Sequence, residues 1–172
     1  MTRQEEFIKL VEGIHREGIY DLMQWLVNDT DFLDAPASTK YHGACVGGLL
    51  THSLNVYYRL DEIAGAYYDD ETILIVSLFH DLCKCDFYAY NFSTDKYIIK
   101  EQFPYGSHGG KSVYLLMKHG LKITDEEAAA INNHMGAWDN TTYHNPSNAF
   151  SEYPLALYLH IADMLATYLD EA

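Results

Sequence analysis

The sequence predicts an all-α domain that carries one small β-hairpin near residues 86–103. Three observations lead to this prediction. Apolar residues recur at helical spacing over most of the 172 residues, and helix-capping residues precede several of these segments. By contrast, the stretch 86–103 has aromatic and β-branched residues on both sides of a polar turn, which is typical of a hairpin.

The N-terminal segment 1–34 is expected to form two short helices that pack over the core. Phe7 and Leu10 share one helical face, and Leu22 and Leu26 share another. Gly18 lies between the two groups, where it is expected to interrupt the helix.

A long helix is expected from about residue 48 to residue 67, with His52 in its first turns. The next helix starts near Asp70 and is apolar nearly all round, which predicts a central buried helix. The adjacent pair His80-Asp81 ends this apolar run. Polar side chains in such a place need partners, so the pair is expected to take part in a site.

Capping residues mark three further helix starts, at Ser107, Thr124 and Pro154. The stretch 136–151 between the last two helices is rich in Asn, Thr and Tyr and is expected to be a loop. The three helices carry the remaining candidate residues: His108, His134 and Asp163.

Composition indicates a single globular domain over residues 1–172, because 48% of the residues are hydrophobic and the length suffices for an ordinary core. No stretch approaches the ~20 uncharged apolar residues of a membrane helix, and residues 1–10 are too polar for a secretion signal. Three cysteines without a paired spacing suit a reducing compartment. A cytoplasmic protein is therefore expected.

The net charge of -14 argues against binding of long nucleic acid, which requires many lysines and arginines to neutralise phosphates. The stretch 84–122 departs from this balance, with six lysines against three acidic residues. Either one face accepts an anion, or these lysines are simply solvated. A small phosphorylated partner is the expectation that suits both the overall charge and this local excess.

Imidazole and carboxylate side chains together suit six-coordinate divalent metals such as Mn or Fe, and six ligands exceed what one tetrahedral zinc uses. Scatter among nine histidines would not by itself indicate a site. The context does, because each candidate lies in or at the edge of a predicted helix. The candidate metal ligands are His52, His80, Asp81, His108, His134 and Asp163.

This ordered set resembles the signature of the HD superfamily of metal-dependent phosphohydrolases, which is His, His-Asp and a distal Asp, with two further His between them in some members. The residues around these ligands are most similar to those of the HD domain of bacterial 3′-to-5′ exoribonucleases. Small stand-alone dinucleoside tetraphosphate hydrolases share the same set of six residues. No segment resembles the OB-fold that accompanies the exoribonuclease domain, which favours a short substrate. The matching stretches are 36–38, 41–42, 47–53, 80–84, 133–136 and 159–163.

The resemblance implies an HD helical bundle over about residues 35–172 and two metal ions per chain, Mn or Fe, with Mg, Ni or Zn as alternatives. It assigns His52, His80, Asp81 and Asp163 to one metal, and Asp81, His108 and His134 to the other. It also implies phosphomonoesterase or phosphodiesterase activity on a nucleotide, dinucleotide or short oligonucleotide, through a metal-activated hydroxide.

Asp81 and Lys84 are the candidate catalytic residues. In the His-Asp-x-x-Lys stretch, Lys84 would stabilise charge on a phosphoryl oxygen, or it is a cation at a helix C-terminus. Cys83 is either a packing residue or a ligand that is sensitive to oxidation. His42 and His160 are either structural or accessory to the site. Trp138 is either a packing residue or a ring that stacks on a base.

Two other functions fit the same ligand set. HD-type diiron oxygenases use it to activate dioxygen, and a non-catalytic HD module would bind a nucleotide without turnover. Dependence on iron and oxygen would distinguish the first, and tight nucleotide binding without product would distinguish the second. The sequence favours no particular substrate or oligomeric state.

Overall fold

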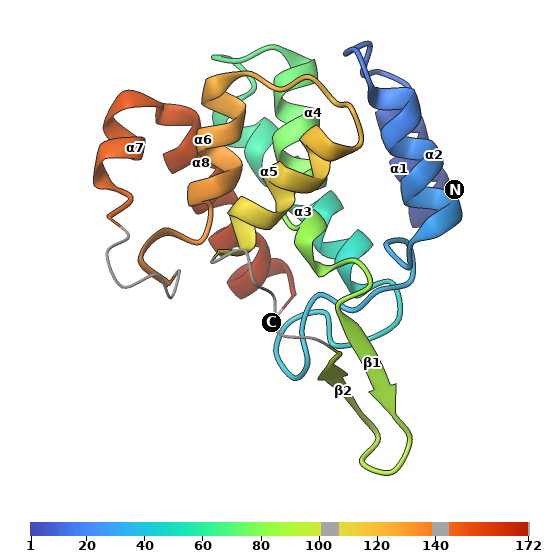
Figure 1. The fold of residues 1–172 in the computed structure, drawn as a ribbon. Helices are drawn as coiled ribbons and strands as arrows, with labels where there is room; N and C mark the ends of the chain where they lie inside the picture. The colour runs from blue at the N-terminus through green and yellow to red at the C-terminus, as the bar shows by residue number, and fades with distance from the viewer. Residues whose placement is uncertain (101–106, 139–144, 172) are drawn as a thin grey trace.

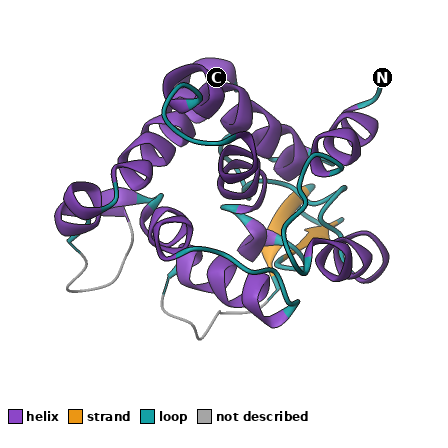
Figure 2. Ribbon diagram, turned by 90° about the horizontal axis from the view of Figure 1, so that it is seen from above, coloured by secondary structure: helices purple, strands orange, loops and turns teal. Residues whose placement is uncertain are grey.

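The computed structural model describes residues 1–100, 107–138 and 145–171. Within these residues helices dominate, and the predicted all-α class with one small hairpin is confirmed (Figures 1 and 2). The α-helices are α1 (Arg3–Val11), α2 (Ile19–Asp29), α3 (Gly48–Ala64), α4 (Asp70–Phe79), α5 (His108–Lys118), α6 (Asp125–Asn133), α7 (Ser147–Glu152) and α8 (Pro154–Leu165). The remaining elements are η1 (Leu82–Lys84), β1 (Tyr88–Asn91), β2 (Lys96–Ile99), η2 (Gly136–Trp138) and the π-helical turn η3 (Ala166–Asp170).

The core is organised around α4, in which every residue from 72 to 79 is buried. This burial agrees with the central helix predicted from a sequence that is apolar nearly all round. Helix α3 packs against α4 and α8, and α6 packs against α5 and α8. No helix in the described part of the chain is long and apolar enough to cross a membrane.

The N-terminal helices are interrupted at Gly18, as predicted. Gly18 has a φ of 90°, and a Cβ atom there would lie 1.9 Å from the carbonyl oxygen of Gly120. A side chain is therefore excluded by both conformation and space. Phe7 of α1 reaches the core, where its ring centroid lies 6.2 Å from that of Phe79.

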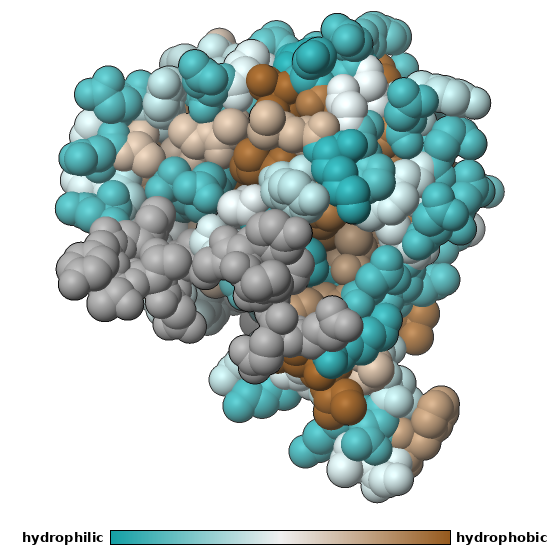
Figure 3. Space-filling view, in the orientation of Figure 1, coloured by the Kyte–Doolittle hydropathy of each residue, from teal (hydrophilic) through white to brown (hydrophobic). Residues whose placement is uncertain are grey.

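The hairpin pairs β1 with β2 in antiparallel register, with Tyr90 opposite Tyr97, and projects from the bundle (Figure 1). Its base is anchored by the backbone N–H of Asp86, which donates to Oδ1 of Asp31 at 2.5 Å. The space-filling view shows hydrophobic atoms on this projection (Figure 3), where Phe92 is 91% exposed. Residues 101–103 of the predicted hairpin segment lie outside the described residues.

The prediction of a loop over 136–151 is wrong for two parts of that stretch. It contains η2 and the six-residue helix α7, while residues 139–144 lie outside the described residues. Helix α7 buries none of its residues completely, and its apolar Phe150 only packs against the edge of the core. A helix this short and this polar has no apolar periodicity to reveal it.

An ion-pair network connects the N-terminal segment to the bundle. The Arg16 guanidinium donates to both carboxylate oxygens of Glu127, at 2.9 and 3.0 Å, and to Glu71 at 2.9 Å. Glu127 is fully buried and also accepts from the backbone N–H of Thr124 in the capping box of α6. Arg16 therefore neutralises a carboxylate that no water reaches.

We expect Arg16→Met to lower the free energy of unfolding by about 3 kcal/mol, because the buried Glu127 carboxylate loses its partner. Urea denaturation measures this loss. Arg59→Met is the matched control, since Arg59 makes a similar forked pair with Asp170 on the surface and its loss should be much smaller. Equal losses in the two variants would contradict this role of Arg16.

Candidate metal centre

Four helices bring five of the six predicted ligands together in the interior. His52 lies on α3, His80 caps α4 and precedes Asp81, His134 caps α6, and Asp163 lies on α8. All five are buried, with exposed fractions between 0% and 5%. So many buried polar groups at one point require compensating partners.

The three buried histidines are oriented by their Nδ1 atoms. Nδ1 of His80 donates to the carbonyl oxygen of Ser77 at 2.8 Å, and Nδ1 of His134 donates to that of Ile131 at 2.7 Å. Nδ1 of His52 donates to Oε1 of Glu171 at 3.1 Å. Because these oxygens only accept, Nδ1 of each ring carries a proton, and Nε2 faces the interior.

The inward-facing atoms form a tight cluster around His52. Its Nε2 lies 3.3 Å from Nε2 of His80, 3.2 Å from Oδ1 of Asp163 and 3.6 Å from Oδ2 of Asp81. Ligands bound to one metal at about 2.1 Å lie roughly 3 to 3.4 Å from one another. His52, His80 and Asp81 each offer a ligand atom, and these atoms all lie within 4.8 Å of one another, so the three residues could hold a divalent metal ion, with Asp163 beside His52.

The electrostatics of the cluster favour positive charge. Burial lowers the pKa of His52, but the hydrogen-bonding carboxylates of Asp163 and Glu171 outweigh it and raise the pKa to about 9. Burial lowers the pKa of His80 to about 4, so this ring is neutral and presents a lone pair. Nε2 of His134 is buried without a hydrogen-bond partner among the described residues. Without metal, His52 carries a proton on Nε2, which a bound cation would displace, and the same cation would satisfy Nε2 of His80 and of His134.

Asp81 divides its two carboxylate oxygens between two groups of residues. Oδ2 faces His52 and His80, while Oδ1 lies 3.4 Å from Nε2 of His134. The Lys84 ammonium lies 2.5 Å from Oδ2. Burial raises the pKa of Asp81, but Lys84 and the histidines outweigh burial and hold it well below its usual value, so Asp81 is ionised.

His108 lies at the edge of the cluster rather than within it. It begins α5 and is exposed, and its Nδ1 lies 3.5 Å from Sγ of Cys83. That sulfur lies 3.9 Å from Oδ1 of Asp81. Burial raises the pKa of the Cys83 thiol to about 12, which does not favour a thiolate ligand. The role of His108 as a second-metal ligand stays a prediction.

Glu171 is a site residue that the sequence did not reveal. Its Oε1 accepts hydrogen bonds from His52 and from Nδ2 of Asn55, which lies one helical turn after His52. Burial raises the pKa of Glu171, but the hydrogen bond from His52 outweighs it, so the group stays ionised. Such a carboxylate orients a ligating imidazole and raises its basicity. In the sequence nothing distinguishes Glu171 from the neighbouring Asp170, which pairs with Arg59 on the surface.

His42 and His160 take different places. The His42 ring centroid lies 4.9 Å from that of His52, and its Nε2 is buried without a hydrogen-bond partner in the described structure. Nδ1 of His160 donates to the backbone carbonyl of His134 at 2.7 Å. Gly136 leaves room for this ring, because a Cβ there would lie 2.7 Å from it. His160 therefore supports the backbone that presents His134.

A pocket of about 470 Å³ opens onto the cluster. Asp81, Lys84 and Asp163 belong to its lining, so the two carboxylates among the proposed ligands are accessible from it. Trp138 and Tyr41 also line the pocket and are 63% and 70% exposed. The pocket thus combines buried charges with exposed aromatic rings.

We expect Asp81→Ala to abolish metal binding, since Asp81 faces both groups of ligands. His134→Ala should remove mainly the second metal and leave the first bound. Titration calorimetry with Mn²⁺ and metal analysis of the dialysed proteins measure both effects. Unchanged metal content in both variants would contradict the assignment.

We expect Glu171→Ala to weaken the affinity for the first metal about 10- to 100-fold, because His52 loses the group that orients it. Glu171→Gln retains an acceptor for His52 and should lose less. Asp170→Ala serves as the control, because the adjacent carboxylate faces the surface. Calorimetric titration measures the three affinities, and equal affinities in Glu171→Ala and Asp170→Ala would refute the orienting role.

Comparison with known proteins identifies one family. The family model described as HD domain matches residues 49–168, which is more than two thirds of the chain and includes all six predicted ligands and Lys84. His42 and Glu171 lie outside the match. Neither the search of curated proteins nor the search of solved structures found a match. The chain therefore belongs to the HD domain family, the superfamily of metal-dependent phosphohydrolases that its sequence resembles.

Proposed function

We propose that this HD protein hydrolyses a phosphoester bond in a nucleotide, a dinucleotide or a short oligonucleotide. The observation that carries the proposal is the pocket over the cluster, which presents Asp81, Asp163 and the Lys84 ammonium together. Metal ligands and a fixed cation at the base of one pocket suit a phosphoryl group.

The residues that would hold metal are those of the two groups around Asp81. His52, His80, Asp81 and Asp163 form the first, and Asp81 with His134 and His108 forms the second. Bound divalent ions supply Lewis acidity, which activates water and polarises a phosphoryl oxygen. The separate directions of the two Asp81 oxygens support this division.

Lys84 is the proposed charge-stabilising residue. Burial lowers its pKa, but the Asp81 carboxylate outweighs burial and raises it, so the ammonium is charged. Its position in the pocket lining, at the end of η1, places it beside any phosphoryl group that approaches Asp81. A preorganised cation in a water-poor site stabilises charge that develops on the phosphoryl oxygens.

The exposed rings at the pocket suit a nucleobase. Trp138 and Tyr41 offer flat aromatic faces on which a base can stack. With a net charge of -14, the protein does not attract long polyanions over its whole surface. Recognition through one pocket, with Lys84 as its fixed cation and room for metal, therefore favours a small anionic substrate.

The test is product formation from nucleotides, dinucleoside polyphosphates and short oligonucleotides with Mn²⁺, measured beside Asp81→Ala and Lys84→Met. We expect Asp81→Ala to be inactive. Lys84→Met should lower kcat by at least about 100-fold while metal stays bound. Lys118→Met, on the exposed last turn of α5, is the control and should retain full activity.

If the metal-bound protein formed no product from any of these substrates, the proposal would be overturned. Oxygen uptake by the iron-loaded protein would then indicate the oxygenase, and nucleotide binding without product would indicate the binding module.

A further inference from the structure

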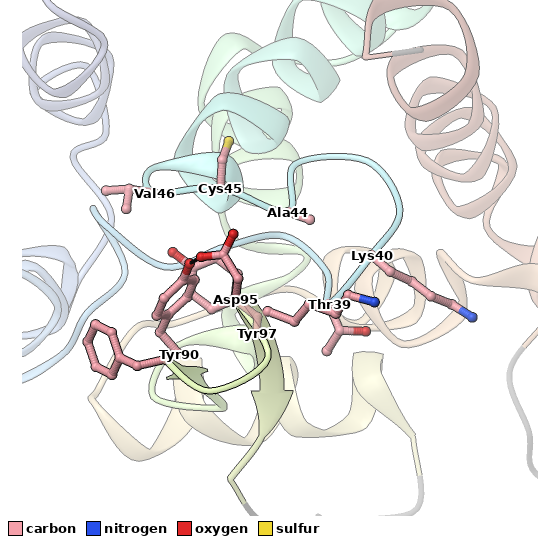
Figure 4. A pocket seen from close by; sticks show the side chains of 10 residues that line it. Thr39, Lys40, Ala44, Cys45, Val46, Tyr90, Asp95 and Tyr97 are labelled. Atoms are coloured by element: carbon pink, nitrogen blue, oxygen red, sulfur yellow. Dashed lines mark hydrogen bonds between the residues drawn. The ribbon is translucent and has the colours of Figure 1, made fainter.

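A second hollow lies beside the metal pocket. It has a volume of about 840 Å³ and separates the loop at residues 39–46 from the projecting hairpin. Figure 4 shows Thr39 and Lys40 of the loop on one side and Tyr90 and Tyr97 of the hairpin on the other. Neither the fold nor the proposed chemistry requires this hollow.

The two pockets share a wall. Thr39 and Lys40 line the hollow, and the next two residues, Tyr41 and His42, line the metal pocket. The Lys40 ammonium lies 4.8 Å from the centroid of the Tyr41 ring. The chain therefore runs without a break from the lining of the hollow to the lining of the metal pocket.

The hairpin lines the hollow with aromatic rings. The centroid of the Tyr90 ring lies 5.1 Å from that of Phe92 and 5.2 Å from that of Tyr97. Phe92 is 91% exposed at the turn, where its ring contributes nothing to the core. Exposed rings of this kind are platforms for unpaired bases, because every base has a π-face that can stack.

The charges around the hollow are complementary to phosphate. Lys40 and Lys96 both line it and are both exposed. The one acidic residue in its lining, Asp95, accepts a hydrogen bond from the Tyr90 hydroxyl. In a chain with a net charge of -14, a hollow with more cations than anions is a local exception.

We propose that this hollow is a subsite for single-stranded nucleic acid, continuous with the metal pocket. The reactive phosphate lies at the metal cluster, and the following nucleotides pass Tyr41 and stack on the hairpin rings, with their phosphates near Lys40 and Lys96. The inference rests on the proposed function and deepens it, because it selects short single strands among the candidate substrates.

The test measures binding and cleavage separately. Fluorescence anisotropy in the absence of metal compares labelled oligo(U) and oligo(dT) of two and of five nucleotides, with a stable duplex of about fifteen base pairs beside them. We expect the pentanucleotides to bind more tightly than the dinucleotides and the duplex. Phe92→Ala should weaken pentanucleotide binding about tenfold and leave dinucleotide binding unchanged, and Phe92→Trp should restore it.

Lys96→Ala tests the phosphate contact by its salt dependence. Loss of one phosphate contact should reduce the slope of log affinity against log salt by about 0.7 for a single strand. Tyr20→Ala and Lys118→Ala are the matched controls, since both residues are exposed on other helices and line neither pocket.

Binding that does not depend on length, or that Phe92→Ala weakens equally for both lengths, would overturn the subsite. Cleavage of nucleotides with Mn²⁺ but without any preference for pentanucleotides would retain the proposed hydrolase and also overturn the subsite. Length-dependent binding that Phe92→Ala removes, without cleavage of any substrate, would support the subsite and reject the hydrolase.

Discussion

The buried carboxylates of Asp81 and Asp163, surrounded by inward-facing imidazole nitrogens, are the constraint on which the rest of the structure depends. Burial of so many acceptors is costly unless a cation is shared among them. The surrounding helices are arranged accordingly, because α3, α4, α6 and α8 each contribute a residue to the same point. In this chain, therefore, the same helix contacts build the core and the candidate metal site.

Two of the histidines use the same local device. His80 and His134 both follow the last residue of a helix, and each ring donates through Nδ1 to the carbonyl three residues earlier. These carbonyls belong to a last helical turn, where intrahelical partners run out. One hydrogen bond thus satisfies the helix end, selects the tautomer and aims Nε2 at the cluster. The end of a helix is for this reason a suitable place for a ligating histidine.

Much of the fold could be predicted because its signals are local. Gly18, the capping residues Ser107 and Thr124, and the apolar run before His80 all act within a few residues, and the structure has the expected elements there. Helix α7 left no such signal, because it is short and hardly buried. The order of histidines and aspartates along the chain also predicts the family, because the ligand types and their sequence are a signature that needs no tertiary contact.

The finer features of the site could not be predicted, because they depend on contacts between distant parts of the chain. Glu171 reaches His52 across 119 residues, and no pattern separates it from Asp170. His108 starts α5 as expected. Its contact with the Cys83 sulfur depends on how α5 packs against η1, which no local pattern shows. The hollow beside the hairpin likewise depends on how the loop at 39–46 faces β1 and β2.

Anomalous scattering tests most directly whether the cluster of histidines and aspartates is a metal site. Crystals grown with Mn²⁺ should show an anomalous peak between Nε2 of His52, Nε2 of His80 and the carboxylates of Asp81 and Asp163. A second peak is expected between Asp81 and His134. Clear density for the side chains without any anomalous peak in the cluster would contradict the account.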